Sequence, residues 1–223
     1  MTARRTETRL ALFDCDGTLI DGQASICEAM ETAFAAHGLA APPRNQVRRA
    51  VGLSLPVAVR GLLPHAGPEV QRAVVESYKQ AFRAARVDGR LAQPLVPGIR
   101  EVLEALHESG WVLGVATGMS ERGLRHCLAE NQLSDLFATL QTADGHPSKP
   151  HPSMAETALF DAACDPRDAV MIGDTVFDIE MAVNAGMRGI GVDWGYHPRE
   201  DLMAAGAELV ARQPADITEY LLS

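Results

Sequence analysis

One stretch near the N-terminus, residues 10–21, constrains the fold more than any other part of the chain. It begins with an apolar run, residues 10–13, which is short enough to be a buried strand. Two carboxylates, Asp14 and Asp16, follow directly; each would be partly desolvated there and would repel the other. A divalent cation removes that cost, and one carboxylate can then act as nucleophile or ligand while the other transfers a proton. The alternative is an acidic turn after an ordinary strand, because Asp-Gly is a common turn dipeptide.

Composition restricts the classes of protein to consider. The chain has 223 residues, of which 47% are hydrophobic, and a net charge of −9, which argues against nucleic-acid and membrane partners. It has no apolar run of about 18 residues, so no transmembrane helix is expected. Residues 1–9 are polar and lead straight into the first predicted strand, so we expect no signal peptide. We expect a cytoplasmic enzyme or binding protein, monomeric or homodimeric. Its four cysteines lack CxxC spacing and are predicted to be free thiols: Cys15, Cys27, Cys127 and Cys164.

Short apolar runs alternate with helical patterns along most of the chain. This alternation predicts an α/β fold, a doubly wound parallel sheet covered on both faces by helices. Pro97 is placed in the first turn of one helix, and Ser120 caps another. The predicted strands cover residues 10–13, 111–117, 137–142, 169–173, 189–193 and 208–211. The predicted helices between and after them end near residues 110, 130, 163, 186, 205 and 222.

Residues 22–88 interrupt this alternation with a purely helical pattern. Ile26, Met30 and Phe34 share one helix face, and Ser54 is a candidate cap for a later helix. We therefore predict a helical cap domain, residues 21–94, inserted into an α/β catalytic core formed by residues 1–20 and 95–223.

The predicted strand ends carry most of the chemically informative residues, and ligands bind beyond the carboxyl ends of strands in open parallel sheets. Taken singly, each residue has an ordinary explanation, such as an acid favoured by a helix N-terminus or a solvated lysine. Together they supply carboxylates, a hydroxyl and an ammonium group, which suit a phosphate group bound beside Mg²⁺. The set comprises Asp14, Asp16, Thr117, Gly118, Lys149, Asp174 and Asp178.

Four motifs in this order resemble those of the haloacid dehalogenase-like (HAD) hydrolase superfamily, in its Mg²⁺-dependent phosphatase branch. DCDGT matches the first motif, DxDGT, and VATG matches the second. Lys149 matches the third, and GDTVFD matches the fourth, GDxxxD. The helical insertion is similar to a C1-type cap. The DCDGTLID, SKPHP and WGYHPREDL stretches are most similar to phosphoglycolate phosphatase-like proteins.

The resemblance implies a role for each residue in the hydrolysis of a small phosphorylated metabolite. Asp14 would form an aspartyl-phosphate, and Asp16 would protonate the leaving group and then activate water. Lys149 would restrain Asp14, and Asp178 would orient the metal shell through its waters. Mg²⁺ would be bound by Asp14, Asp174 and the backbone carbonyl of Asp16. The implied phosphate-binding residues are Asp14, Cys15, Asp16, Thr117, Gly118 and Lys149.

Some positions depart from the family pattern and leave the substrate open. Cys15 is interpreted as a small filler, Gly22 replaces a frequent serine at the cap hinge, and a glycine is missing before Lys149. His65 and His197 remain ambiguous. The cap arginines are candidates for contact with a substrate carboxylate or hydroxyl, although each is more typical of a solvated surface: Arg44, Arg48, Arg49 and Arg60.

Other functions on the same fold are also considered. A phosphomutase would share every core residue, and a non-catalytic phosphometabolite-binding protein would be expected to lose Asp14 or Asp16. A dehalogenase needs neither a metal nor a carboxylate at position 16, so DCDGT argues against it.

Overall fold

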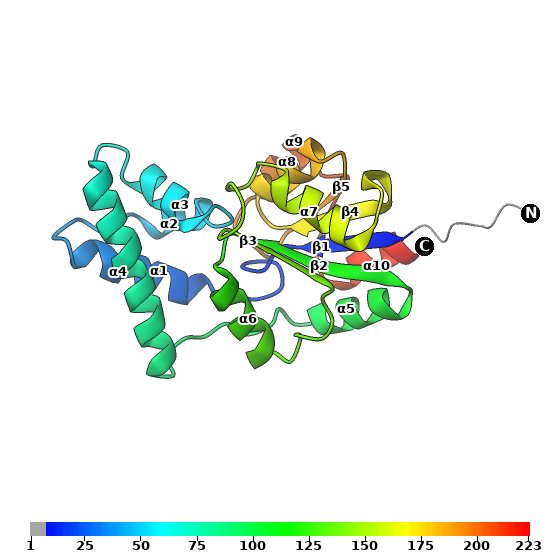
Figure 1. Cartoon of the computed structure of the whole chain (residues 1–223), viewed down its shortest axis with the longest axis horizontal. Helices are drawn as coiled ribbons and strands as arrows, with labels where there is room; N and C mark the ends of the chain where they lie inside the picture. The colour runs from blue at the N-terminus through cyan, green and yellow to red at the C-terminus, as the bar shows by residue number, and fades with distance from the viewer. Residues whose placement is uncertain (1–7) are drawn as a thin grey trace, which may run out of the picture.

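The computed structural model describes residues 8–223; the expectation about a signal peptide concerns a segment that lies largely outside the described residues. Six strands form one sheet in the order β3-β2-β1-β4-β5-β6 (Figure 1). Every pairing in the sheet is parallel, so the predicted α/β fold is confirmed. The strands are β1 (Arg9–Phe13), β2 (Trp111–Thr117), β3 (Thr139–Thr142), β4 (Ala169–Gly173), β5 (Arg188–Val192) and β6 (Leu209–Ala211).

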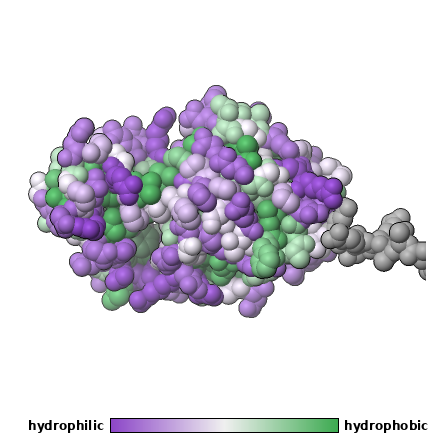
Figure 2. Space-filling model, turned by 45° about the horizontal axis from the view of Figure 1, so that its top comes forward, coloured by the Kyte–Doolittle hydropathy of each residue, from purple (hydrophilic) through white to green (hydrophobic). Residues whose placement is uncertain are grey.

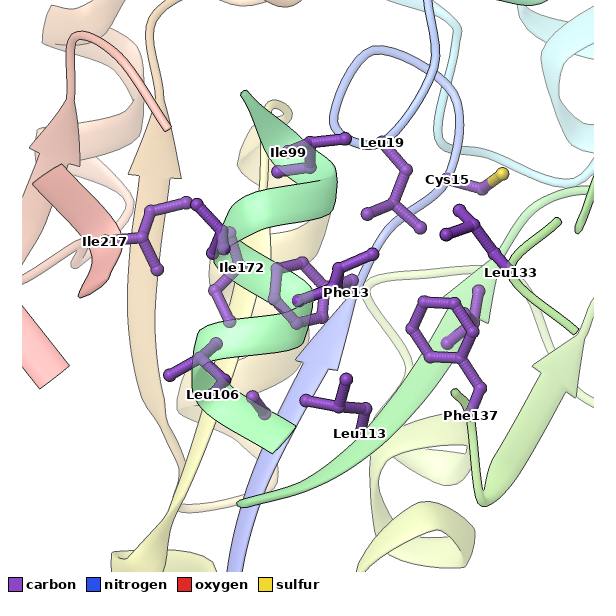
Figure 3. Packing of buried hydrophobic residues seen from close by; sticks show 14 of the residues in the cluster. Phe13, Cys15, Leu19, Ile99, Leu106, Leu113, Leu133, Phe137, Ile172 and Ile217 are labelled. Atoms are coloured by element: carbon purple, nitrogen blue, oxygen red, sulfur yellow. The ribbon is translucent and has the colours of Figure 1, made fainter. Parts of the chain in front are cut away.

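The central strand β1 is buried on both faces, which explains its uninterrupted apolar sequence. Successive side chains of a strand point to opposite faces. Leu10 and Leu12 belong to the hydrophobic cluster on one face, whereas Ala11 and Phe13 belong to the cluster on the other. Figure 3 shows Phe13 packed among Ile172, Leu106 and Leu113 in the second of these clusters.

Helices cover the two faces of the sheet in separate layers. The cluster that contains Phe13 is closed by α5 (Ile99–Glu108), α6 (Glu121–Glu130) and α10 (Ala215–Leu222). The opposite cluster is closed by α7 (Ser153–Ala162) and α8 (Val176–Asn184). A short 3-10 turn, Pro166–Asp168, precedes β4, and α9 (Arg199–Ala204) packs against α8, β5 and β6. The core is thus a three-layered structure.

The remaining helices form a block with its own hydrophobic cluster at the carboxyl ends of the strands (Figure 1). Two connecting segments run side by side between the block and the sheet: the Asp21 N–H donates to the Pro94 carbonyl at 2.9 Å. The cluster is built on residues such as Phe34 and Val74, which are at most 1% exposed. The helices of the block are α1 (Gln23–Ala35), α2 (Arg44–Arg49), α3 (Leu55–Leu62) and α4 (Pro68–Val87).

Three local predictions were wrong in detail. Pro97 lies before α5, because Gly98 occupies the N-cap position with a left-handed backbone, φ +90°. Ser54 stands at the N-cap of α3, but its side chain makes no capping bond; its N–H instead donates to Ser148 Oγ at 2.9 Å. The third strand begins at Thr139, and Phe137 packs into the core ahead of it.

The face drawn in Figure 2 is mostly hydrophilic, with hydrophobic residues in separate areas. Within residues 8–223, no helix combines the length and apolar character needed to cross a membrane.

Candidate active site

The order of the strands brings the predicted site residues together. β1 lies between β2 and β4 and runs parallel to both, so the carboxyl ends of all three meet at one edge of the sheet. Asp14 follows β1, Thr117 ends β2, and Asp174 follows β4. From β2 the chain goes on to β3 on one side of β1, and from β4 it goes on to β5 on the other side. Ligands bind at such a change of direction in open α/β sheets.

A buried lysine links two of the acidic residues. Lys149 Nζ donates to Asp14 Oδ1 at 2.8 Å and to Asp178 Oδ1 at 2.6 Å, and its side chain is fully buried. Burial alone would lower the pKa of Lys149, but the two carboxylates outweigh it and raise the pKa above its usual value. Lys149 is therefore a fixed positive charge. The contact with Asp14 is the one that the resemblance implies, whereas the contact with Asp178 was not predicted.

The start of α8 holds Asp178 in place. Its Oδ2 accepts hydrogen bonds from the Thr175 N–H at 3.0 Å and from Thr175 Oγ1 at 2.7 Å. Gly173 has no side chain because one there would collide with the Asp178 carboxylate. Both oxygens of Asp178 are thus engaged by protein donors, so this carboxylate orients Lys149.

Asp174 is held from two other directions. Thr18 Oγ1 donates to its Oδ1 at 2.8 Å, and the Tyr196 N–H donates to its Oδ2 at 2.9 Å. Gly17 allows this approach: its backbone has φ +90°, and a side chain there would overlap Asp174 and the Tyr196 ring. Burial, with the neighbouring charges of Asp14 and Asp178, raises the pKa of Asp174 well above its usual range.

The acidic cluster fits a divalent cation. Asp14, Asp174 and Asp178 are all buried, and each offers an oxygen within 4.8 Å of the others. Asp14 Oδ2 is buried and has no hydrogen-bond partner within the described residues. Burial raises the pKa of Asp14 from 3.8 to about 6, although Lys149 lowers it. A hard cation with oxygen ligands would supply the charge that these carboxylates lack.

Asp16 differs from Asp14 in its surroundings. Burial, followed by the charge of Asp14, raises the pKa of Asp16 from 3.8 to about 7. Its Oδ1 is buried and finds no partner among the residues described. A carboxyl group with a pKa near neutral pH can both donate and accept a proton during a reaction.

These groups open into a cavity of about 540 Å³ between the sheet edge and the helical block. Asp14, Asp16, Thr117 and Gly118 line its core side. A side chain at Gly118 would lie 2.5 Å from the Leu53 carbonyl oxygen, so glycine permits the helical block to approach β2 closely. The structure therefore places the predicted residues of all four motifs at or directly beneath one cavity.

Comparison with known proteins assigns the chain to a family. A model of the haloacid dehalogenase-like hydrolases matches residues 11–192. The chain belongs to this family. It is 34% identical over 204 residues to the probable phosphatase IndB of Dickeya dadantii, covering 90% of this chain and 88% of the relative. It is 27% identical to a phosphoglycolate phosphatase of Vibrio vulnificus, covering 97% of both chains. The fold matches a crystal structure of a predicted phosphatase from Clostridium acetobutylicum with a TM-score of 0.86, 23% identity and coverage of 97% and 99%.

In this haloacid dehalogenase-like hydrolase, the four cap arginines named as candidates from the sequence do not line the cavity. Arg44 forms an exposed ion pair with Glu31 at 2.6 Å, and Arg60 is exposed. His65 is exposed, whereas His197 is buried and approaches the Arg49 carbonyl at 3.2 Å. The cations that do line the cavity were missed: Lys79, Arg83 and Arg86 of α4, and Arg122 of α6.

The cysteines of the hydrolase are free, as predicted, and all four are buried. Cys15 is fully buried between the two catalytic candidates. Its contact with Cys127 and its burial raise the pKa of the thiol well above its usual value. The side chain of Cys15 is therefore a neutral packing group.

Proposed function

We propose that this hydrolase is a Mg²⁺-dependent phosphatase that acts on a phosphate monoester of a small metabolite, phosphoglycolate-like or a sugar phosphate. The observation that carries the proposal is the buried Lys149 between Asp14 and Asp178, beside the second acid of the first motif, Asp16. A nucleophile, a proton carrier and a fixed cation then meet at one cavity. The names of the relatives, a probable phosphatase and a phosphoglycolate phosphatase, support the same reaction.

The side chains of Asp14 and Asp174 and the backbone carbonyl of Asp16 would hold the metal, with Asp178 beside them. When bound, Mg²⁺ supplies positive charge that neutralises the carboxylates and the phosphate oxygens.

In the proposed mechanism Asp14 attacks phosphorus and forms an aspartyl-phosphate. The bond to the leaving oxygen breaks as Asp16 gives that oxygen a proton. Asp16 then takes a proton from water, which attacks phosphorus and releases phosphate from Asp14. Lys149 fixes the orientation of Asp14, while the Thr117 hydroxyl and the Gly118 N–H bind phosphoryl oxygens.

We also propose that residues 21–94 act as a cap over this reaction. The helical block supplies the far wall of the cavity, and its Gly52–Leu53 backbone lies against Gly118. Closure of the block would exclude water other than the attacking molecule.

The test is phosphate release from a panel of phosphomonoesters, with Mg²⁺ or with EDTA. Wild type, Asp14→Asn and the control Asp165→Asn, which changes an exposed aspartate, are compared. We expect Mg²⁺-dependent release that the control retains and Asp14→Asn loses. Absence of release by the wild type, or equal activity of the two variants, would contradict the proposal. An isomerised sugar phosphate in place of free phosphate would identify a phosphomutase, and binding without turnover would favour a binding protein.

A further inference from the structure

Within the described residues, three arginines that line the cavity form no ion pair: the exposed Arg83, and Arg86 and Arg122. Arg86 lies near the end of α4 in the helical block, and Arg122 lies in the first turn of α6 in the core. Within residues 8–223, neither has a carboxylate at ion-pair distance. Arg72, on the same helix as Arg86, pairs with Glu69 and does not line the cavity.

The two guanidinium groups lie close enough to repel each other. The pKa of Arg86 is lowered first by burial and then by the charges of Arg122 and Arg83, while Glu130 opposes the shift. Arg86 Nε is buried and has no hydrogen-bond partner among the described residues. A desolvated donor beside a like charge is unfavourable. An anion between the two side chains would satisfy the donor and remove the repulsion.

The face of α4 that leads to Arg86 is aromatic. Tyr78, Phe82 and Arg86 are spaced four residues apart, so they share one face of the helix, and all three line the cavity. The rings of Tyr78 and Phe82 stack with centroids 5.7 Å apart and planes at 24°. Tyr78 and Asp16 line the same cavity, and burial followed by the charge of Asp16 raises the pKa of Tyr78.

The length of this face sets the size of the group that it can bind. Eight residues of α-helix separate Tyr78 from Arg86, which is about 12 Å along the axis. A ligand that spans this face from Tyr78 to Arg86 must be longer than a small hydroxy acid such as glycolate. The cavity volume of about 540 Å³ is likewise in the range that accommodates much larger ligands.

We propose that the substrate has a flat, largely apolar leaving group with a second anionic group at its far end; this rests on the phosphatase reaction proposed above and replaces the phosphoglycolate-like or sugar substrate given there. The flat part lies against Tyr78 and Phe82, and the carboxylate or phosphate at the end binds between Arg86 and Arg122. Since one arginine belongs to the cap and the other to the core, this anion also draws α4 and α6 together across the cavity; the two helices face each other in Figure 1.

The test uses a matched pair of rigid esters, biphenyl phosphate and its para-carboxy derivative, which place a neutral or an anionic group at the required reach. We expect the wild type to prefer the carboxylated ester by about tenfold or more in kcat/KM, as for a charge-assisted hydrogen bond. Arg86→Gln and Arg122→Gln should each abolish the preference, mainly by raising KM for the carboxylated ester. The control Arg72→Gln should retain the preference.

Several results would overturn the assignment: equal kcat/KM for the two esters in the wild type, a preference that survives both substitutions, or hydrolysis of phosphoglycolate with no turnover of either biphenyl ester. Arg122 is exposed, so its variant tests the proposal even where Arg86→Gln disturbs packing. Failure of the phosphatase proposal is distinct, because it would show as no phosphate release from any ester.

Discussion

Replacing Lys149 with methionine tests the electrostatic account of the site most directly. The lysine is fully buried and donates to Asp14 at 2.8 Å and to Asp178 at 2.6 Å, and these carboxylates are at most 1% exposed. Methionine fills similar space but leaves two buried carboxylates without their cation. Breaking a buried ion pair by removing one partner destabilises by about 3–5 kcal/mol. We expect Lys149→Met to lose that much unfolding free energy in EDTA at neutral pH.

The loss should depend on pH with a definite sign. Burial already raises the pKa of Asp14 from 3.8 to about 6 while Lys149 opposes the rise. Without Lys149 the pKa of Asp14 in the folded protein rises further. Between the ordinary pKa of 3.8 and this raised pKa, the folded variant therefore binds more protons than the unfolded chain. Stability then falls as pH rises through this window. The difference between wild type and variant should be larger at about pH 8 than at about pH 5.

Urea unfolding at both pH values measures these differences. Lys79→Met is the matched control, because Lys79 is an exposed lysine that pairs with Glu76 at 2.7 Å. An exposed pair contributes little, so the control should unfold close to the wild type. A loss below about 1 kcal/mol in Lys149→Met, or a loss that grows as pH falls, would refute the reasoning.

Four further predictions concern other parts of the molecule. Ser120→Ala removes the side-chain acceptor for the Gly123 N–H at the start of α6 and should lower the unfolding free energy by about 1 kcal/mol in a urea titration. Leu103→Ala opens a cavity in the core under the sheet and should cost about 2–5 kcal/mol by the same assay, with the m-value unchanged. Gly118→Ala places a methyl group 2.5 Å from the Leu53 carbonyl, so it should push the helical block away and lower kcat/KM more than it lowers stability. Thermal stabilisation by Mg²⁺ should increase from about pH 5 to about pH 8, because protons compete with the cation for carboxyls of raised pKa; stabilisation that is independent of pH would contradict the proposed ligands.

The core of the fold could be predicted from sequence because its signals are local. An apolar run that ends in an acid or a Thr-Gly pair indicated β1, β2 and β4 with their correct carboxyl ends. Ser120 was predicted as a cap from its position before a helical pattern, and its side chain does accept the Gly123 N–H. Pro97 misled because proline favours a first helical turn, whereas Gly98 was free to adopt the left-handed conformation that begins α5.

The missing part of the site depends on contacts that no local pattern contains. Helical spacing shows that Tyr78, Phe82 and Arg86 share a face, but not that this face meets the cavity. The arginines near VGLSLP were considered because of their position in the sequence, and the fold turns them elsewhere. Likewise, the bond between Lys149 and Asp178 joins residues 29 positions apart, one in the loop between β3 and α7 and the other in the first turn of α8.

The segment that joins β1 to the helical block passes close to Asp16, the proposed proton carrier. Gly22, where the family often has serine, lies at the N-cap of α1 with an ordinary φ of −97°, so its backbone does not require glycine. A side chain there would instead lie 2.9 Å from Asp16 Oδ1 and 3.8 Å from Gln93 Nε2 on the returning segment. Both polar atoms are buried without partners in the described chain. If residues 21–94 close as the cap proposed above, a shift of the two connecting segments would change the surroundings of Asp16 directly, and the absence of a side chain at position 22 leaves space for that shift.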